Sequence, residues 1–169
     1  MRNKAALAAC LLAATPAAAH VTLTETSARP GAAYVAHFRV GHGCSGSPTT
    51  ALRVDLPQTV SSVKPQEAPG WTLKTEQAAG RITSVTWRGG SLAADQPGEF
   101  AIAMTLPQTS AKLNFPATQT CEKGVEQWSE LPAADGHPLK NPAPVLTVSP
   151  EPAKAPDAAM PGMMPGMKM

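Results

Sequence analysis

A histidine follows a run of small residues near the start of the chain, where residues 14–26 read ATPAAAHVTLTET. Residues 17–19 are all alanine and fit the A-x-A pattern that precedes a signal-peptide cleavage site. Cleavage after Ala19 would make His20 the first residue, and its α-amine (ordinary pKa about 8) and imidazole (about 6.5) would form a two-nitrogen chelate. Nitrogen sites favour Cu(II) among the divalent ions, so the pattern predicts a copper site at His20. The alternative interpretation is a histidine that follows the cleavage site by chance.

A second histidine lies in the glycine-flanked sequence GHGCSG, where His42 precedes Cys44. Cys44 and Cys121 are the two cysteines of the predicted mature chain, and in an oxidising compartment we expect them to form a disulfide. The alternative is a pair of thiolate metal ligands, although neither cysteine belongs to a C-x-x-C motif. A disulfide would fix the turn that carries His42. His42 is therefore a candidate further ligand, and the alternative is a polar turn residue.

Trp128 follows Cys121 closely in the sequence EKGVEQWSE. If Cys121 is bonded to Cys44, Trp128 is tied to the turn of His42, where its indole would shield a metal site from solvent. Position alone makes core packing the simpler interpretation of this tryptophan. Core packing is also what we expect for the two remaining tryptophans, at positions 71 and 87.

Methionines gather at the end of the chain. Thioether sulfur is a soft ligand that suits Cu(I), and Met104 is the only other methionine of the predicted mature chain. The cluster predicts a Cu(I)-binding tail, with low-complexity drift as the alternative. The residues concerned are Met160, Met163, Met164, Met167 and Met169.

Residues 1–19 have the layout of a signal peptide. Arg2 and Lys4 precede an apolar run over residues 5–15 that is too short to span a bilayer. The sequence LAAC, which ends at Cys10, also fits a lipoprotein signal, but its apolar core would be unusually short. We therefore expect cleavage after Ala19 and a periplasmic location.

The body of the chain has the two-residue period of β-strands. Apolar and polar residues alternate in short runs that are bounded by turn-forming residues, which is typical of an antiparallel sandwich with one buried face per sheet. We expect an all-β fold, an immunoglobulin-like β-sandwich of seven to nine strands, over residues 20–148. The runs are Val21–Thr26, Tyr34–Val40, Ala51–Leu56, Trp71–Glu76, Ile82–Trp87 and Phe100–Leu106. Turns are expected at Pro30–Gly31, Pro69–Gly70, Gly89–Gly90 and Pro97–Gly98.

Residues 149–169 differ from the body in composition. They are rich in Pro, Ala, Gly and Met and show no hydrophobic period, so we expect a flexible tail.

The charge of the chain bears on two classes of partner. Lys and Arg number 14 and Asp and Glu 12, and the predicted cleavage removes two of the basic residues. The mature chain is therefore close to neutral and has no basic cluster. This argues against nucleic acid and anionic membranes as partners.

Four features together resemble the YcnI-like domains, a family of exported bacterial β-sandwich proteins that bind copper. They are AHVT at the predicted cleavage site, ARPGA at residues 28–32, APGW at residues 68–71 and the segment around Trp128. The likeness covers residues 20–148. It implies a single-histidine brace, in which the amine and the ring of His20 hold copper, a carboxylate completes the site and Trp128 lies close to the metal.

The implied carboxylate is where this chain departs from the family. No Asp or Glu lies between Glu25 and Asp55, and the comparable turn reads GHGCSG. We expect His42 to supply the additional ligand, with Glu25 and Glu126 as the alternatives.

These observations predict a periplasmic copper-binding protein that stores or hands over copper. Its partners would be the copper ion and another copper-trafficking protein or a membrane copper transporter. We expect no enzymatic activity, because the sequence contains no nucleophile–base motif, phosphate-binding loop or H-E-x-x-H motif. A copper-dependent oxidative enzyme with a histidine brace is one alternative, and a metal-free adhesion or assembly domain is another.

Overall fold

The computed structural model describes residues 20–132 and 136–150, which form twelve β-strands and no helix. The predicted signal peptide, Cys10 and the five tail methionines lie outside these residues. The strands are β1 (Val21–Leu23), β2 (Ser27–Ala28), β3 (Ala33–Val40), β4 (Thr49–Asp55), β5 (Ser61–Pro65), β6 (Thr72–Ala78), β7 (Arg81–Leu92), β8 (Gly98–Thr105), β9 (Ala111–Asn114), β10 (Ala117–Cys121), β11 (Val125–Trp128) and β12 (Val145–Val148). Nowhere in these ranges does a helix occur that could cross a membrane.

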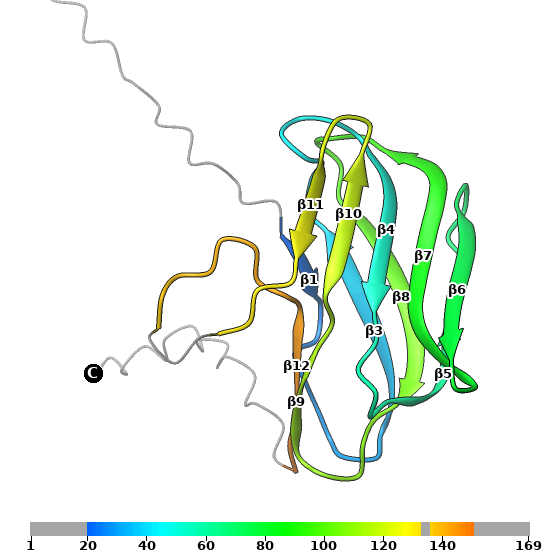
Figure 1. Cartoon of the computed structure of the whole chain (residues 1–169), viewed down its shortest axis with the longest axis vertical. Coiled ribbons are helices and arrows are strands. Elements are labelled where there is room, and N and C mark those ends of the chain that lie inside the picture. The colour runs from blue at the N-terminus through cyan, green and yellow to red at the C-terminus, as the bar shows by residue number, and fades with distance from the viewer. Residues whose placement is uncertain (1–19, 133–135, 151–169) are drawn as a thin grey trace, which may run out of the picture.

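Two larger sheets form the layers of the sandwich (Figure 1). One has the strand order β1-β3-β8-β5 and the other β11-β10-β4-β7-β6, and all neighbours within them run antiparallel. A smaller sheet, β2-β12-β9, includes a parallel pair, β2 with β12. The predicted all-β sandwich is confirmed.

The alternating pattern of β3 shows why the sequence forms this layer. Tyr34, Ala36, Phe38 and Val40 are buried, while His37 between them points to the other face. There the Nδ1 atom of His37 lies 2.8 Å from the carboxylate of a glutamate on β8, in an exposed cross-strand pair.

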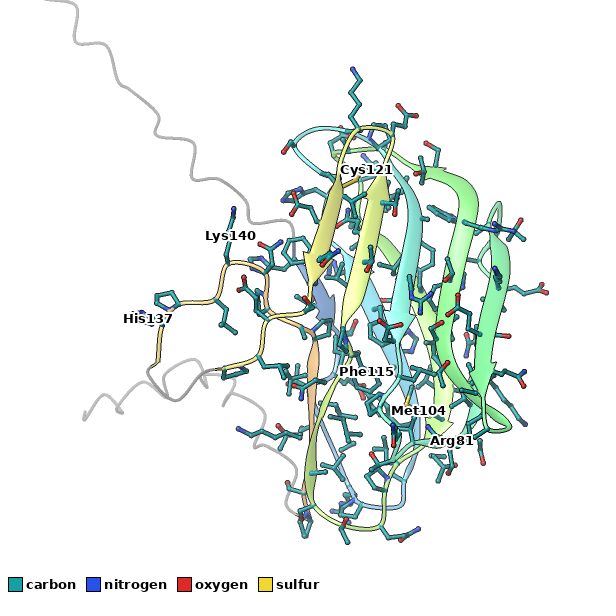
Figure 2. All side chains as sticks on the ribbon, viewed as in Figure 1. Arg81, Met104, Phe115, Cys121, His137 and Lys140 are labelled. Carbon is teal, nitrogen blue, oxygen red and sulfur yellow. A yellow bond between two sulfur atoms is a disulfide. The ribbon has the colours of Figure 1, made fainter. Side chains whose placement is uncertain are left out.

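Aromatic rings fill the space between the sheets. The Phe38 and Phe115 rings meet edge to face with centroids 5.5 Å apart. The centroid of the Phe100 ring lies 5.1 Å from that of Trp87 and 5.0 Å from that of Trp71. Trp87 is fully buried, and Trp71 packs against the same core. The core-packing interpretation of these two tryptophans is therefore confirmed. Figure 2 shows Phe115 in this interior.

The number of strands and two of the turns differ from expectation. The strands exceed seven to nine, because several of two to four residues are too short to produce a visible period. Gly89–Gly90 is not a turn but lies inside β7. Gly89 has φ +79°, and the pairing of β7 with β4 shifts register beside it, so these glycines form an irregularity within one long strand. The chain reverses at residues 94–96 rather than at Pro97–Gly98, because Gly98 already belongs to β8.

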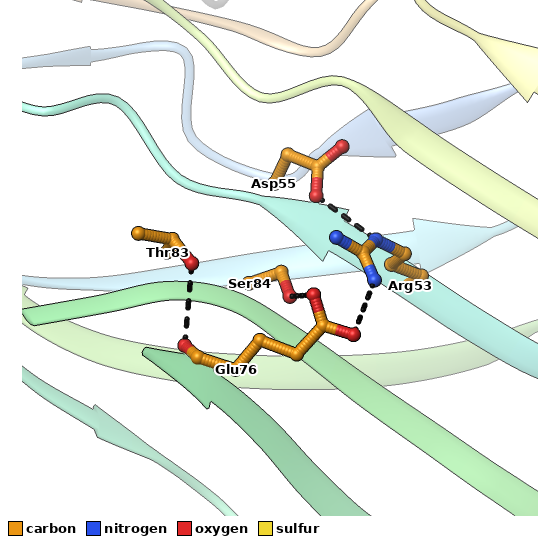
Figure 3. A network of polar contacts seen from close by, with 5 residues as sticks. All are labelled: Arg53, Asp55, Glu76, Thr83 and Ser84. Atoms are coloured by element: carbon orange, nitrogen blue, oxygen red, sulfur yellow. Dashed lines mark hydrogen bonds and ion pairs between the residues drawn. The ribbon is translucent and has the colours of Figure 1, made fainter. Parts of the chain in front are cut away.

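The outer face of the larger sheet carries a polar network (Figure 3). The Arg53 guanidinium lies 3.0 Å from Asp55 and 2.9 Å from the Glu76 carboxylate, to which the Ser84 hydroxyl also donates. The hydrogen bond from Arg53 holds the pKa of Glu76 below its ordinary value. The network joins β4, β6 and β7 on the face that is turned away from the core.

Candidate metal centre

The ring of His20 lies against the indole of Trp128. Their centroids are 5.3 Å apart and the rings are inclined at 44°. His20 immediately precedes β1, whereas Trp128 ends β11, so the contact joins the edge strands of the two layers (Figure 1). Trp128 is buried and His20 is half-buried. The structure thus brings together two residues that the sequence separates by most of the domain.

The start of β1 also lies beside the turn that carries His42. Val21 pairs with Val40, so the preceding position places His20 opposite Gly41. A Cβ atom added to Gly41 would lie 3.9 Å from the His20 carbonyl oxygen, which is an ordinary contact. His42 is the next residue of this turn.

The turn itself is held at several points. A Cβ atom on Gly43 would collide with the Ser47 carbonyl oxygen, so this close approach requires glycine. The backbone then reverses between Cys44 and Ser47. Ser45 and Gly46 have φ values of +48° and +80°, and the Ser47 amide donates to the Cys44 carbonyl at 2.8 Å.

The Cys44–Cys121 disulfide is formed, with a sequence separation of 77. The prediction of a disulfide is confirmed, and the alternative of two thiolate ligands is excluded because the sulfurs are bonded to each other. Figure 2 shows Cys121 at the end of β10. The disulfide therefore fixes the turn of His42 to the five-stranded sheet.

His42 is oriented by its own turn. Its Nδ1 atom lies 2.9 Å from the Gly43 carbonyl oxygen. A carbonyl only accepts, so Nδ1 is the donor in this bond and carries the proton. Metal-binding histidines commonly make such a bond through the ring nitrogen that does not face the metal. The hydrogen bond is thus compatible with Nε2 of His42 as a ligand.

The two carboxylates considered from sequence differ in position. The Glu25 carbonyl accepts a 2.6 Å hydrogen bond from Tyr34, which lies near the opposite end of β3 from the turn of His42. Glu126 lies on β11 two positions before Trp128, so both side chains point to the same face. Its carboxylate accepts a 3.0 Å hydrogen bond from Asn141. Glu126 is thus the better placed of the two alternatives.

Sequence reasoning missed Gln119, which is only 1% exposed and lies between these groups. Its side-chain oxygen accepts from the Trp128 indole at 3.2 Å. Its amide nitrogen donates to the His42 carbonyl at 2.9 Å and to the Thr49 hydroxyl at 2.8 Å. The only signal in the sequence is the alternation of ATQTC, which puts Gln119 on the same buried face as Cys121.

Among the described residues, no three His, Cys, Asp or Glu side chains are grouped as a metal site. Cleavage after Ala19 would add the α-amine of His20 as a further nitrogen donor. The ring of His20 beside a buried indole, with His42 on the adjacent turn and Glu126 on the face of Trp128, fits such an amine-anchored site.

His137 takes no part in this centre. It lies in an exposed loop segment that stands apart from the strands of the sandwich (Figure 2). The structure therefore brings His20, His42 and Trp128 into one region and leaves His37 and His137 outside it.

Comparison with known proteins identifies a family and a fold. The family model described as "Domain of unknown function (DUF1775)" matches residues 20–148. A crystal structure of an uncharacterized protein from Nocardia farcinica, described as revealing an immunoglobulin-like fold, is 34% identical, with a TM-score of 0.67 over 77% of this chain and 98% of that chain.

A cohesin module from a Clostridium perfringens family 33 glycoside hydrolase is 10% identical, with a TM-score of 0.47 over 76% of this chain and 93% of that chain. No curated protein matches the sequence. The likeness to the Nocardia farcinica protein confirms the predicted immunoglobulin-like sandwich. With the family match over residues 20–148, it shows that the chain belongs to the DUF1775 family, which is the YcnI-like family.

Proposed function

We propose that this protein is an exported, periplasmic copper-binding protein that stores or hands over copper. The observation that carries the proposal is the contact between the rings of His20 and Trp128, 5.3 Å apart, at the position where the predicted mature chain begins. A histidine that merely followed a cleavage site would need no buried partner. Here it is seated against an indole, beside a turn that a disulfide fixes.

His20 anchors the ion through its α-amine and its ring, which are two nitrogen donors on one residue. We propose His42 as the further ligand, because the bond from Nδ1 to the Gly43 carbonyl orients its ring. Glu126 is the alternative, since it shares a face with Trp128. Trp128 covers one side of the His20 ring and limits the access of water to that side.

The methionine tail is long enough to reach this site. The Ser149 amide donates to the Ala28 carbonyl at 3.0 Å, which fixes the point where the tail begins. Residues 20 to 28 span no more than about 29 Å even when fully extended. Ten residues, the separation of Pro150 from Met160, can cover about 31 Å in an extended polyproline conformation. A tail that captures Cu(I) would therefore hold a second pool of copper, in the other oxidation state, within reach of His20.

A calorimetric titration tests the function. The chain that begins at His20 is titrated with Cu(II), beside the variants His20→Ala and His137→Ala, after intact mass has verified each N-terminus. We expect His20→Ala to abolish tight binding while its thermal unfolding stays close to that of the parent, because the side chain is only half-buried. His137→Ala controls for a histidine outside the site and is expected to bind normally. Equal Cu(II) affinity in the parent and in His20→Ala would end the proposal.

A further inference from the structure

Gln119 is a buried amide that is hydrogen-bonded in three directions. A glutamine side chain has two N–H donors and an oxygen acceptor. The donors reach the His42 carbonyl and the Thr49 hydroxyl, and the oxygen receives the Trp128 indole N–H. Burial of such a group is unfavourable unless the hydrogen bonds that it made with water are replaced. These partners are therefore a condition for burying Gln119.

The partners also fix which way the amide points. The indole of Trp128 only donates, and the His42 carbonyl only accepts. A flipped amide would face the indole with an N–H group and the carbonyl with its oxygen, and both bonds would be lost. The hydrogen-bond network therefore permits one orientation of Gln119, and that orientation determines where the indole nitrogen can lie.

The backbone that presents Gln119 is held on both sides. Gln119 pairs with Leu52 of β4 and with Glu126 of β11. Its bond to His42 and the disulfide that Cys121 forms have the same sequence separation, 77. The turn of His42 therefore runs alongside the end of β10. The hydrogen bond joins Gln119 to His42, and two residues further along both segments the disulfide joins Cys121 to Cys44.

We propose that Gln119 is a positioning residue of the candidate metal centre. Its oxygen holds the indole of Trp128 at the angle at which it contacts the His20 ring, and its nitrogen holds the backbone of His42. One side chain thereby holds the end of β11, with the start of β1 that contacts it, in a defined position relative to the turn after β3. The inference rests on the proposed function for its consequence in copper binding, whereas the positioning itself belongs to the metal-free protein.

The variant Gln119→Met tests the positioning, because methionine fills a similar volume, has no N–H donor and offers the indole only a weakly accepting thioether sulfur. Gln127→Met is the matched control, since Gln127 is an exposed glutamine on β11. Both variants are compared with the parent by NMR in metal-free form. The readouts are hydrogen exchange of the Trp128 indole proton and the chemical shifts of the His20 ring protons, which the adjacent indole displaces.

We expect exchange of the Trp128 indole proton to accelerate about tenfold in Gln119→Met, which is the loss of one hydrogen bond. The His20 ring shifts are expected to move toward the values of an unstructured histidine. Exchange of the Trp87 indole proton, which is bonded to the Gln66 carbonyl, should stay unchanged, as should both readouts in Gln127→Met. Unchanged His20 shifts and Trp128 exchange in a folded Gln119→Met protein would overturn the proposal.

A measurement on the parent covers the case in which Gln119→Met does not fold. In the metal-free parent the side-chain nitrogen of Gln119 donates to the His42 carbonyl and to the Thr49 hydroxyl, and the Trp128 indole donates to its oxygen. We expect the side-chain amide protons of Gln119 and the indole proton of Trp128 to exchange slowly with solvent. Rapid exchange of these protons in the folded parent would contradict the positioning.

The copper consequence is measured separately. We expect Gln119→Met to weaken Cu(II) binding about tenfold, in the range found for residues that orient metal ligands, with Gln127→Met binding as the parent does. If the parent itself binds no Cu(II), the proposed function fails while the NMR result for Gln119 stands. If the parent binds and Gln119→Met binds equally well with altered NMR shifts, the role of Gln119 in copper binding is refuted.

Discussion

Removal of the Cys44–Cys121 disulfide is expected to lower the free energy of unfolding by up to about 4.5 kcal/mol. The bond closes a loop with a sequence separation of 77, and the chain-entropy relation converts a loop of this length into about that value at 25 °C. Small domains unfold with about 5–15 kcal/mol in total. The double substitution Cys44→Ala/Cys121→Ala therefore removes a large share of the stability.

Urea unfolding of the metal-free proteins measures this loss. For an m-value of about 1.5–2 kcal/mol/M, a loss of about 4.5 kcal/mol moves the midpoint down by about 2–3 M. The reduced parent should unfold close to the double variant, because both lack the constraint on the unfolded chain. A reductant should have no effect on the double variant itself, which controls for reactions elsewhere in the protein.

The reasoning fails if the double variant unfolds within about 0.5 M of the oxidised parent with an unchanged m-value. A decrease in m accompanied by a small midpoint shift would instead indicate residual structure in the unfolded state. The disulfide also fixes the turn of His42, so we expect the double variant to lose the native amide shifts of that turn.

Three further predictions concern charge and ligation. Burial, reinforced by the charge of a nearby glutamate, raises the pKa of Tyr34 from 10.0 to about 12. Its contribution to stability is therefore complete below pH 10.0 and disappears as the pH rises toward about 12, and unfolding of Tyr34→Phe across this range should lack that alkaline loss. The pKa of Glu76 is lowered by Arg53. Its contribution to stability is therefore present above the ordinary carboxyl pKa and is lost as the pH falls through the lower pKa of the folded protein. The urea midpoint of Glu76→Gln should accordingly fall less steeply with decreasing pH than that of the parent. In Cu(II) titrations, His42→Ala should weaken binding and Glu126→Gln should not, and the reverse result would assign the further ligand to Glu126.

The strands that sequence predicts best are those with one buried face. Tyr34–Val40 alternates cleanly because one set of side chains enters the core and the other faces solvent, and β3 covers that run. The strands β9 to β12 have four or five residues each. The runs of β9, β11 and β12 contain too few apolar positions to reveal a period, and the pairs β10 with β4 and β12 with β9 join strands that are distant in the sequence.

The residues of the candidate site also differ in how well the sequence predicts them. His20 and the cysteines are recognisable from their chemistry, because a histidine behind a predicted cleavage site suggests a metal ligand and a lone cysteine pair behind a predicted signal peptide suggests a disulfide. Gln119 carries no such signal. Its role arises from partners that only the fold supplies, namely the indole of Trp128 and the carbonyl of His42. The position of Glu126 relative to Glu25 likewise depends on strand order.

The central claim is that one residue binds Cu(II) through its own amine and ring. It is tested most directly by comparing a chain that begins at His20 with one that begins at Pro16, since both contain every side chain of the site. The longer chain lacks a free amine on His20, and we expect its Cu(II) affinity in calorimetry to fall by about a hundredfold, or about 2.7 kcal/mol. Equal affinity of the two chains would contradict the account.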